Sequence, residues 1–322
     1  MRLATLRDGS PDGALAVISA DGARYLAAPG LSLLAAIGDW GRAEPVLQRL
    51  AAGVAAGQGG RLDPARLQAP LPRTWQWLDG SAFLQHGKLM QVAFHLPPIE
   101  TDRPLMYQGL SDRFYGPTDD IPLPSEADGI DFEGEYAVIT DAVPMGTSAA
   151  DAAGHIRLIV QLNDWSLRAI APVEMKTGFG WVQAKPACSM APFAITPDEL
   201  GAAWADGRVG ADLHVAWNGA AFGQPNGAEM SVSFADLVAH AARTRDLVAG
   251  TLIGSGTVSN AAYATVGSAC ISERRAIEII AAGQPATPFM GFGDAVRMEA
   301  RLPDGRCPFG AIDQRVIRAV AP

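Results

Sequence analysis

The sequence predicts a mainly β protein with some α-helices, preceded by a small N-terminal domain that also contains β-strands. Three observations support this fold class. Residues 130–139 alternate between apolar and polar side chains, residues 156–162 form a β-branched apolar run, and residues 296–302 alternate again before a Pro-Asp-Gly turn at 303–305. A period of two is typical of strands, because successive strand residues point to opposite faces.

Residues 1–72 carry the pattern of the small domain. Short apolar runs within 15–28 are flanked by glycines, which predicts short hairpins. A helical stretch follows over about 31–56, and its internal glycines and proline are expected to divide it in two. The Pro/Gly-rich passage 57–72 is the best candidate linker. Because 322 residues exceed the usual size of one domain, we expect a second, larger domain over 73–322.

The larger domain is expected to hold more strand than helix. Its segment 105–128 is rich in proline and glycine, so it cannot be a regular helix, and loops of this length often line sites. Short helices with polar starting residues are predicted near 147–155, 196–200 and 233–242. Residues 251–260 predict a strand that runs into a glycine-bearing turn.

Composition excludes several classes of protein. The net charge is −9, from 25 basic and 34 acidic residues, and no basic run occurs, so we expect no nucleic-acid or anionic-membrane partner. No apolar run is long enough for a membrane span or a signal peptide. The three cysteines, Cys188, Cys270 and Cys307, are far apart and form no CxxC spacing, which argues against a zinc site or a disulfide framework. A cytoplasmic location is therefore expected.

Glu133 and Glu135 are the most informative residues for function. On a strand, residues two apart point to the same side, so the two carboxylates should project together. Two like charges held this close must be solvated, share a proton or bind a cation. The solvated face of an antiparallel strand is the plain alternative, although Gly134 between them favours close approach of a ligand or another backbone.

A third carboxylate, Asp164, directly follows the apolar run 156–162. It would stand at the edge of a sheet, where it could meet a ligand, and an Asx turn or helix cap is the alternative. Three carboxylates without cysteine or histidine in ligand spacing favour a hard cation, Mg²⁺ or Ca²⁺, over zinc.

Two further residues could act on a substrate. His86 lies seven residues after Asp79, which would place both on one face of a helix, and a structural histidine is the alternative. Lys185 follows an aromatic stretch that includes Trp181. A lysine in apolar surroundings could have a lowered pKa or bind an anionic substrate group, and a solvated surface lysine is the alternative.

The segment 254–257, Gly-Ser-Gly-Thr, is a possible binding turn. It lacks the spacing of a P-loop and of a dinucleotide-binding motif, so we reject a nucleotide site there. Its backbone N–H groups and the Thr257 hydroxyl could still hold a carboxylate.

Six short segments, taken in order, resemble the fumarylacetoacetate hydrolase superfamily, and within it the bacterial fumarylacetoacetase-like branch. The similarity covers about residues 73–318. The segments are 79–86, 106–109, 131–135, 162–168, 183–186 and 254–259. This resemblance implies a mixed β-roll catalytic domain behind a small N-terminal β domain, in a homodimer.

The resemblance also implies roles for individual residues. Four carboxylates match the metal ligands of the family: Asp79, Glu133, Glu135 and Asp164. The implied cation is Mg²⁺ or Ca²⁺, with Mn²⁺ as an alternative. Three side chains match positions that hold the substrate's oxygens: Tyr107, Lys185 and Thr257. His86 matches the base that activates water, and Glu273 lies near the acid that orients it, at a spacing about two residues longer than in the animal enzyme.

The implied activity is metal-dependent hydrolysis of a carbon–carbon bond in a β-diketo acid. Fumarylacetoacetate, an intermediate of tyrosine and aromatic catabolism, is the leading candidate, and Lys185 would help to neutralise the charge that develops. The animal enzyme has a glutamine and a tyrosine that touch substrate where this chain has Ala171 and Met175. An acylpyruvate hydrolase, or a keto-acid decarboxylase or hydratase, is therefore the alternative. From another class, a non-catalytic ligand-binding β protein would not need His86, Lys185 and the carboxylates together.

Overall fold

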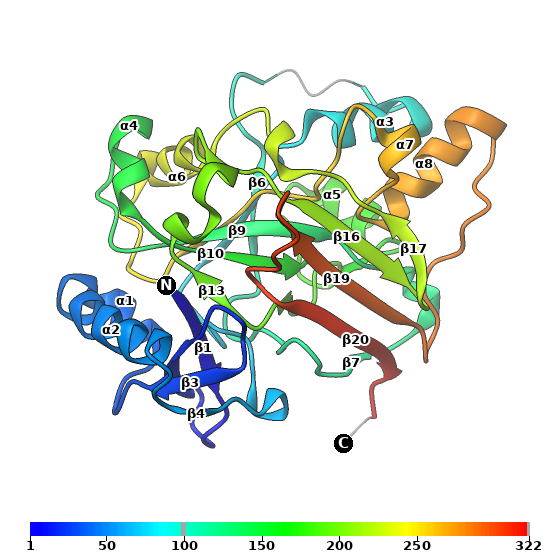
Figure 1. Cartoon of the computed structure of the whole chain (residues 1–322). Helices are drawn as coiled ribbons and strands as arrows, with labels where there is room; N and C mark the ends of the chain where they lie inside the picture. Colours follow the sequence, from blue (N-terminus) through cyan, green and yellow to red (C-terminus); the bar gives the residue numbers. More distant parts are fainter. Residues whose placement is uncertain (98–100, 321–322) are drawn as a thin grey trace.

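The computed structural model describes residues 1–97 and 101–320, and most of its strands lie in two sheets (Figure 1). The strands of the larger sheet, in pairing order, are β4 (Gly60–Arg61), β3 (Arg24–Ala27), β2 (Ala14–Ile18), β1 (Arg2–Leu6), β13 (Ala194–Ile195), β10 (Ile156–Asn163), β9 (Gly134–Thr140), β18 (Leu252–Gly254), β5 (Trp77–Gly80) and β6 (Met106–Gly109), with β12 (Ser189–Met190) also beside β10. All pairs in this sheet are antiparallel except β18 and β5. The sheet is therefore mixed, as expected.

The smaller sheet contains the predicted C-terminal hairpin. Its strands, in pairing order, are β17 (Ala220–Gly223), β16 (Asp212–Trp217), β19 (Ala295–Arg301), β20 (Ala311–Arg318) and β7 (Ile121–Leu123). Buried and exposed residues alternate along β19 and β20, which confirms the period of two in the sequence. Short strand pairs are formed by β8 (Ile130–Asp131) with β11 (Ser166–Leu167) and by β14 (Trp204–Ala205) with β15 (Arg208–Val209).

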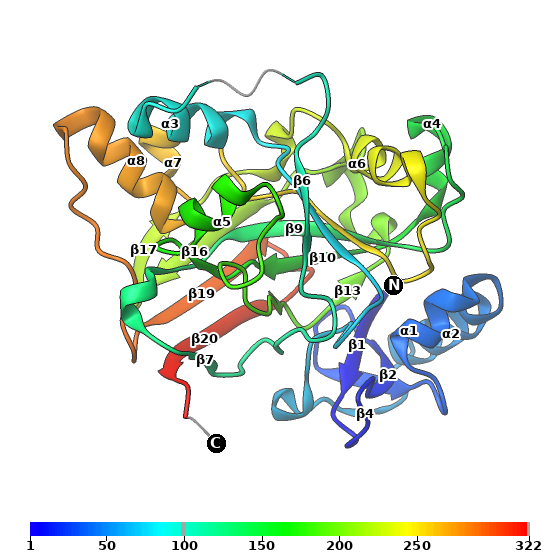
Figure 2. The same ribbon diagram turned by 180° about the vertical axis from the view of Figure 1, so that it is seen from behind.

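The N-terminal unit is joined to the rest through the larger sheet, because β1 pairs with β13 (Figure 2). Its helices are α1 (Leu33–Gly38) and α2 (Trp40–Ala55), so the predicted helical stretch is divided at Asp39. Pro45 lies inside α2 and does not end it. The domain boundary near residue 72 stays a prediction.

The remaining helices are short and surround the sheets (Figures 1 and 2). They are α3 (Leu84–Phe94), α4 (Ala149–Ala152), α5 (Ala171–Thr177), α6 (Phe234–Ala241), α7 (Tyr263–Val266) and α8 (Ile271–Ala282). Single turns of 3₁₀ helix are η1 (Pro64–Arg66), η2 (Glu126–Asp128), η3 (Ala153–His155), η5 (Gly227–Glu229) and η6 (Ala242–Thr244), and η4 (Pro197–Ala203) is longer. The predicted helices near 147–155 and 233–242 begin where expected, because Ser148 and Ser233 cap α4 and α6. The predicted helix at 196–200 is 3₁₀ in form.

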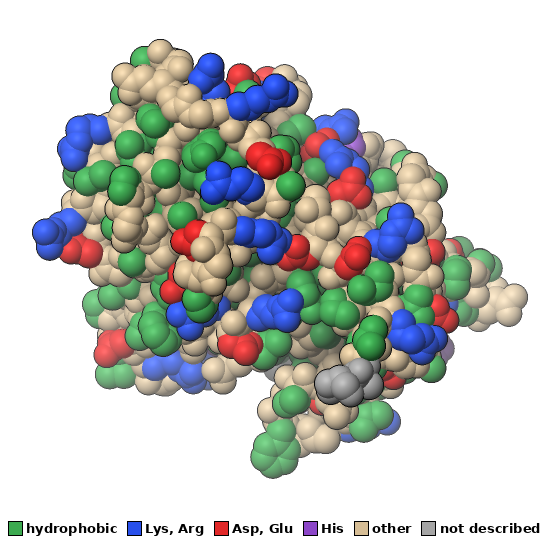
Figure 3. Space-filling view, turned by 90° about the horizontal axis from the view of Figure 1, so that it is seen from below, with side chains coloured by type: hydrophobic (Ala, Val, Ile, Leu, Met, Phe, Trp, Pro, Cys, Tyr) green, Lys and Arg blue, Asp and Glu red, His purple; other side chains and the backbone are tan. Residues whose placement is uncertain are grey.

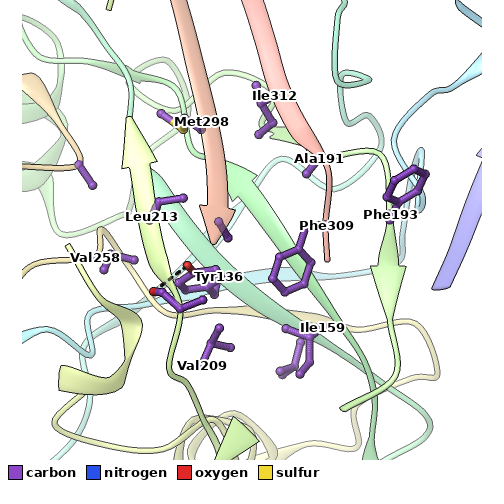
Figure 4. Close-up of a cluster of buried hydrophobic side chains, with 14 of the residues drawn as sticks. Tyr136, Ile159, Ala191, Phe193, Val209, Leu213, Val258, Met298, Phe309 and Ile312 are labelled. Carbon is purple, nitrogen blue, oxygen red and sulfur yellow. Dashed lines mark hydrogen bonds between the residues drawn. The ribbon is translucent and has the colours of Figure 1, made fainter. Parts of the chain in front are cut away.

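A large hydrophobic core lies between the two sheets (Figure 4). Tyr136 of β9 and Ile159 of β10 meet Leu213 of β16 and Met298 of β19 there, and all four side chains are buried. Burying a side chain such as Ile159, Leu213 or Met298 stabilises a fold by about 1.5–3 kcal/mol. The Tyr136 hydroxyl donates a hydrogen bond of 3.1 Å to the carbonyl of Ala211, so its polar atom is satisfied. This core packs β9 and β10 against β16 and β19, and so fixes the strands next to the acidic residues.

Charges of both signs are mixed on the face seen from below (Figure 3). That mixture agrees with the absence of a basic run in the sequence. Among the described residues, no helix has the length and apolar character needed to cross a bilayer.

Candidate active site and metal centre

Neighbouring strands place the predicted acidic residues on one face of the larger sheet. Asp79 of β5 pairs directly with Tyr107 of β6 on one side and with Gly254 of β18 on the other. Glu135 of β9 pairs with Leu162 of β10, two residues before Asp164. Residues far apart in the chain therefore converge because their strands are adjacent. Glu133 and Glu135 are both buried, so the solvated explanation of the glutamate pair is wrong.

Three carboxylates form a group that could hold a metal ion. Asp79, Glu135 and Asp164 each offer one oxygen atom, these atoms lie within 4.8 Å of one another, and all three residues are buried. Within the described part of the chain, neither carboxylate oxygen of Glu135 has a hydrogen-bond partner. Burial, and then the neighbouring carboxylates, raise the pKa values of Asp79 and Glu135 well above their usual range. Buried, unsatisfied oxygen donors fit a hard divalent cation such as Mg²⁺, Mn²⁺ or Ca²⁺.

A glycine on the intervening strand lets Asp79 reach this group. A Cβ atom at Gly254 would lie 2.3 Å from Oδ1 of Asp79 and 2.3 Å from the ring of Trp77. The Asp79 carboxylate therefore occupies the space that a side chain on β18 would fill. The backbone N–H of Gly256 donates to Asp79 Oδ1 at 3.0 Å. The glycine-bearing turn thus holds a carboxylate of the protein itself.

Lys185 is a buried cation within the acidic site. Its Nζ atom lies 2.7 Å from Glu133 Oε2 and 2.7 Å from Asp164 Oδ2, and the residue is 7 % exposed. Burial disfavours the charged amine, but Asp164 and Glu133 outweigh it and raise the pKa of Lys185. The predictions of a solvated lysine and of a lowered pKa are both wrong.

Glu133 lies beside the group of three. One of its oxygens accepts from Lys185 and the other from Arg168. Burial would favour its neutral form, but Lys185 and Arg168 reverse the effect, so the pKa of Glu133 is lowered. Its role as a fourth metal ligand stays a prediction.

Aromatic and thiol groups surround Asp164 and Lys185. The Tyr107 hydroxyl donates to Asp164 Oδ2, and Cys188 Sγ donates to Asp164 Oδ1 at 3.0 Å. Lys185 Nζ lies 5.3 Å from the ring centroid of Tyr107 and 5.6 Å from that of Trp181. These rings reduce access of water to the lysine, which strengthens its interactions with the carboxylates.

Thr257 is also buried and follows Gly256, which binds Asp79. The structure therefore brings Thr257 to the same turn as the Asp79 contact. Its role in holding a substrate oxygen, like that of Tyr107, stays a prediction.

His86 and Glu273 come together from two helices. His86 is the third residue of α3 and Glu273 the third residue of α8, and His86 Nδ1 lies 2.9 Å from Glu273 Oε2. Glu273 is fully buried. The prediction that Asp79 and His86 share one helix face is wrong, because Asp79 lies in β5 and α3 begins only at Leu84.

Two residues of the site were not singled out from the sequence. Asp131 and Arg168 are bonded to each other, Nε to Oδ2, at 2.8 Å, and Arg168 also donates to Glu133. Asp131 lies in segment 131–135 and Arg168 in segment 162–168, and both segments also contain carboxylates that the sequence predicts as metal ligands. The sequence signal that could have identified them is a charged residue in each of these two segments.

The fold and this site define a class of protein with a buried acidic group that could hold a metal ion, a buried lysine and a histidine–glutamate pair. The chain belongs to the fumarylacetoacetate hydrolase family, whose C-terminal domain matches residues 76–317. Residues 1–73 match fumarylacetoacetase N-terminal domain 2.

Among curated relatives, 2,4-didehydro-3-deoxy-L-rhamnonate hydrolase from Sphingomonas sp. (strain SKA58) is 27 % identical over 163 residues. That match covers 50 % of this chain and 54 % of the relative, so the chain spans about half the length of the curated relative it matches.

Two solved structures show the same fold along their whole length. Maleylpyruvate hydrolase from Sphingobium sp. SYK-6, in complex with manganese(II) and pyruvate, has a TM-score of 0.68 at 16 % identity, over 99 % of this chain and 100 % of that one. The 5-carboxymethyl-2-hydroxymuconate delta-isomerase from Mycobacterium smegmatis has a TM-score of 0.62 at 19 % identity, over 100 % of both chains. The curated relative and these two structures are named as hydrolases and an isomerase, and the two structures share the fold of this chain.

Proposed function

We propose that this protein is a metal-dependent hydrolase that cleaves a carbon–carbon bond in a β-diketo acid. The observation that carries the proposal is the buried group of Asp79, Glu135 and Asp164, with Lys185 bonded to one of its members. When ionised, the carboxylates of Asp79, Glu135, Asp164, Glu133 and Asp131 would carry five negative charges, against four positive ones from a divalent cation, Lys185 and Arg168. This near balance would lower the repulsion that the carboxylates alone would exert on an anionic substrate.

The chemistry divides between the cation and the protein. A divalent cation held by Asp79, Glu135 and Asp164 would polarise a substrate carbonyl as a Lewis acid. With Nδ1–H of His86 donated to the Glu273 carboxylate, Nε2 keeps the lone pair and can accept a proton from water. The hydroxide formed from that water would add to the carbonyl carbon, and the carbon–carbon bond would then break with its electron pair passing to an enolate, which would take back the proton held by His86. Lys185 would stabilise the negative charge on the enolate oxygen.

The substrate is proposed from two classes. Fumarylacetoacetate is the leading prediction from sequence, and an acylpyruvate is the alternative. Two observations support the alternative: the named activities of the relatives, a deoxy-rhamnonate hydrolase and a maleylpyruvate hydrolase, and the small or exposed residues Ala171 and Met175 on α5. Met175 is 56 % exposed, so its side chain would contribute little to enclosing the distal end of a substrate.

The test is hydrolysis of both candidate substrates by purified protein, supplied with Mg²⁺, Mn²⁺ or Ca²⁺ after removal of bound metal. We expect cleavage of at least one β-diketo acid, with loss of activity in EDTA and recovery on metal addition. No cleavage of either substrate with any of the three cations would overturn the proposal.

His86→Ala separates hydrolysis from the decarboxylase alternative. Hydrolysis should fall by about 10²–10⁴-fold without the base. Metal-driven decarboxylation, which needs no activated water, should survive the substitution.

Calorimetry bears on the non-catalytic alternative, because a ligand-binding protein that only retains the fold has no need to bind these cations. Homodimer assembly and a cytoplasmic location stay predictions.

A further inference from the structure

Asp131 links the acidic centre to the histidine–glutamate pair. It is fully buried, and its carboxylate accepts from the backbone N–H groups of Ile271 at 2.7 Å and Ser272 at 2.9 Å. These are the first two residues of α8, whose amides have no acceptor within the helix. A carboxylate at this place satisfies both amides and interacts favourably with the positive end of the helix. Glu273, the partner of His86, is the next residue.

Asp131 Oδ2, which accepts from Ser272, also accepts from Arg168, and this arginine ties Asp131 to the acidic group. Arg168 donates from Nε to Asp131 at 2.8 Å and from Nη2 to Glu133, so one guanidinium bridges the two carboxylates. The backbone reinforces this link, since Gly134 N–H donates to the Ala269 carbonyl at 3.0 Å. β9, which carries Glu135, is therefore fixed to the segment directly before α8.

Other contacts of Glu273 would not hold it in place alone. Within the described residues, its Oε1 atom has no hydrogen-bond partner, and its backbone N–H donates to Cys270 Sγ at 3.3 Å. The position of its carboxylate therefore depends on where the first turn of α8 begins.

We infer that Asp131 is a positioning residue, which sets the place of the His86–Glu273 pair relative to the metal centre by holding the first turn of α8. The inference rests on the proposed function for its catalytic meaning, but its structural part can be measured without turnover. Asp131 does not touch the substrate in this account, and acts only through α8.

The test compares Asp131→Asn with Asp141→Asn. Asp141 is a matched control, because it follows β9 directly and also pairs with an arginine, Arg157, at 2.7 Å. In Asp131→Asn, hydrogen exchange of the Ile271 and Ser272 amides should speed up by roughly tenfold or more, and Asp141→Asn should leave it unchanged. Unchanged exchange in the folded Asp131 variant would overturn the inference.

Histidine resonances give a second measurement that needs no substrate. The protein has five histidines, so labelled imidazole signals can be assigned with His86→Asn. Asp131→Asn should shift the His86 signal in the wild-type background, and the shift should be much smaller when Glu273→Gln is already present. An equal shift in both backgrounds would show that Asp131 does not act through Glu273.

Kinetics distinguish this inference from failure of the proposed function. If the wild type hydrolyses a β-diketo acid, Asp131→Asn should lower kcat by about 10- to 100-fold, while KM and Mn²⁺ affinity change less than about threefold. A large loss of Mn²⁺ affinity with unchanged kcat would contradict a positioning role. If the wild type turns over no substrate but the exchange and resonance changes occur, the positioning role stands and only the function is overturned.

If Asp131→Asn does not fold, Ser272→Pro removes one of the two donated N–H groups instead. Proline is tolerated in the first turn of a helix, so α8 should persist. The same change in the His86 resonance is expected, and its absence in folded Ser272→Pro would overturn the inference.

Discussion

Gly254→Ala should disable the metal centre by displacing Asp79. The added Cβ would lie 2.3 Å from Asp79 Oδ1, about 1 Å short of the 3.4 Å at which ordinary van der Waals contact begins. The Trp77 ring, also at 2.3 Å, prevents the new methyl group from moving the other way. The carboxylate must therefore shift by about 1 Å, a displacement that can cost about 10²-fold in a positioned site. Overpacking of this kind also costs about 1–3 kcal/mol of folding free energy.

The assay is Mn²⁺ binding by calorimetry, together with thermal unfolding in EDTA. Gly80→Ala is the comparison variant, because successive strand residues point to opposite faces, and its Cβ would lie 3.0 Å from Leu237 and 3.0 Å from the Gly254 carbonyl. We expect Gly254→Ala to lose Mn²⁺ affinity by tenfold or more, and Gly80→Ala to lose stability while keeping that affinity. Mn²⁺ binding by Gly254→Ala within threefold of the wild type would refute the reasoning.

Three further predictions follow from buried or paired charges. Lys185→Met removes one partner of two buried ion pairs, so the metal-free protein should lose about 3–5 kcal/mol of stability, measured by denaturant unfolding. Added Mn²⁺ should restore part of this stability, and an unchanged unfolding midpoint in the metal-free protein would contradict the prediction. Burial and neighbouring carboxylates raise the pKa values of Asp79 and Glu135, so protons compete with a cation for these groups. Mn²⁺ affinity should therefore rise as pH increases from about 5 to 8, and calorimetry that shows a pH-independent affinity would count against the site. Glu174→Gln should loosen the segment before Lys185, because the Glu174 carboxylate accepts three backbone N–H groups of residues 182–184, which also lower its pKa. Chymotrypsin should then cleave faster after Phe179, which is 97 % exposed, whereas an unchanged cleavage rate would show that this anchor does not hold the segment.

Local pattern was sufficient to predict most of the strand residues that lead to the acidic group. The apolar run before Asp164 corresponds to β10, and the alternation around Glu135 corresponds to β9, which pairs with β10. The predicted strand over 130–139 is interrupted at Phe132 and Glu133, between β8 and β9, so only Glu135 of the pair lies in β9. The two strands are separated by a short stretch of chain, so the sequence could suggest that their carboxylates meet. Burial of the pair could not be predicted in this way, because the groups that surround the two glutamates, Asp79, Asp164, Arg168 and Lys185, come from other segments of the chain.

Contacts between distant segments could not be predicted from pattern alone. The helical relation of Asp79 to His86 was wrong because spacing by itself cannot distinguish a helix from a strand that ends at Gly80. Lys185 was open to a solvated interpretation because its partners, Glu133 and Asp164, lie 52 and 21 residues away. The pairing of His86 with Glu273 spans 187 residues, and only the family resemblance indicated it.

The account depends most directly on a cation bound among three carboxylates. An anomalous difference map from a crystal grown with Mn²⁺ would locate that cation without any assumption about substrate. We predict one strong peak within bonding distance of oxygens of Asp79, Glu135 and Asp164, and its loss in Glu135→Gln. A map with no peak at these residues, at a Mn²⁺ concentration that saturates the wild-type protein in solution, would contradict the account.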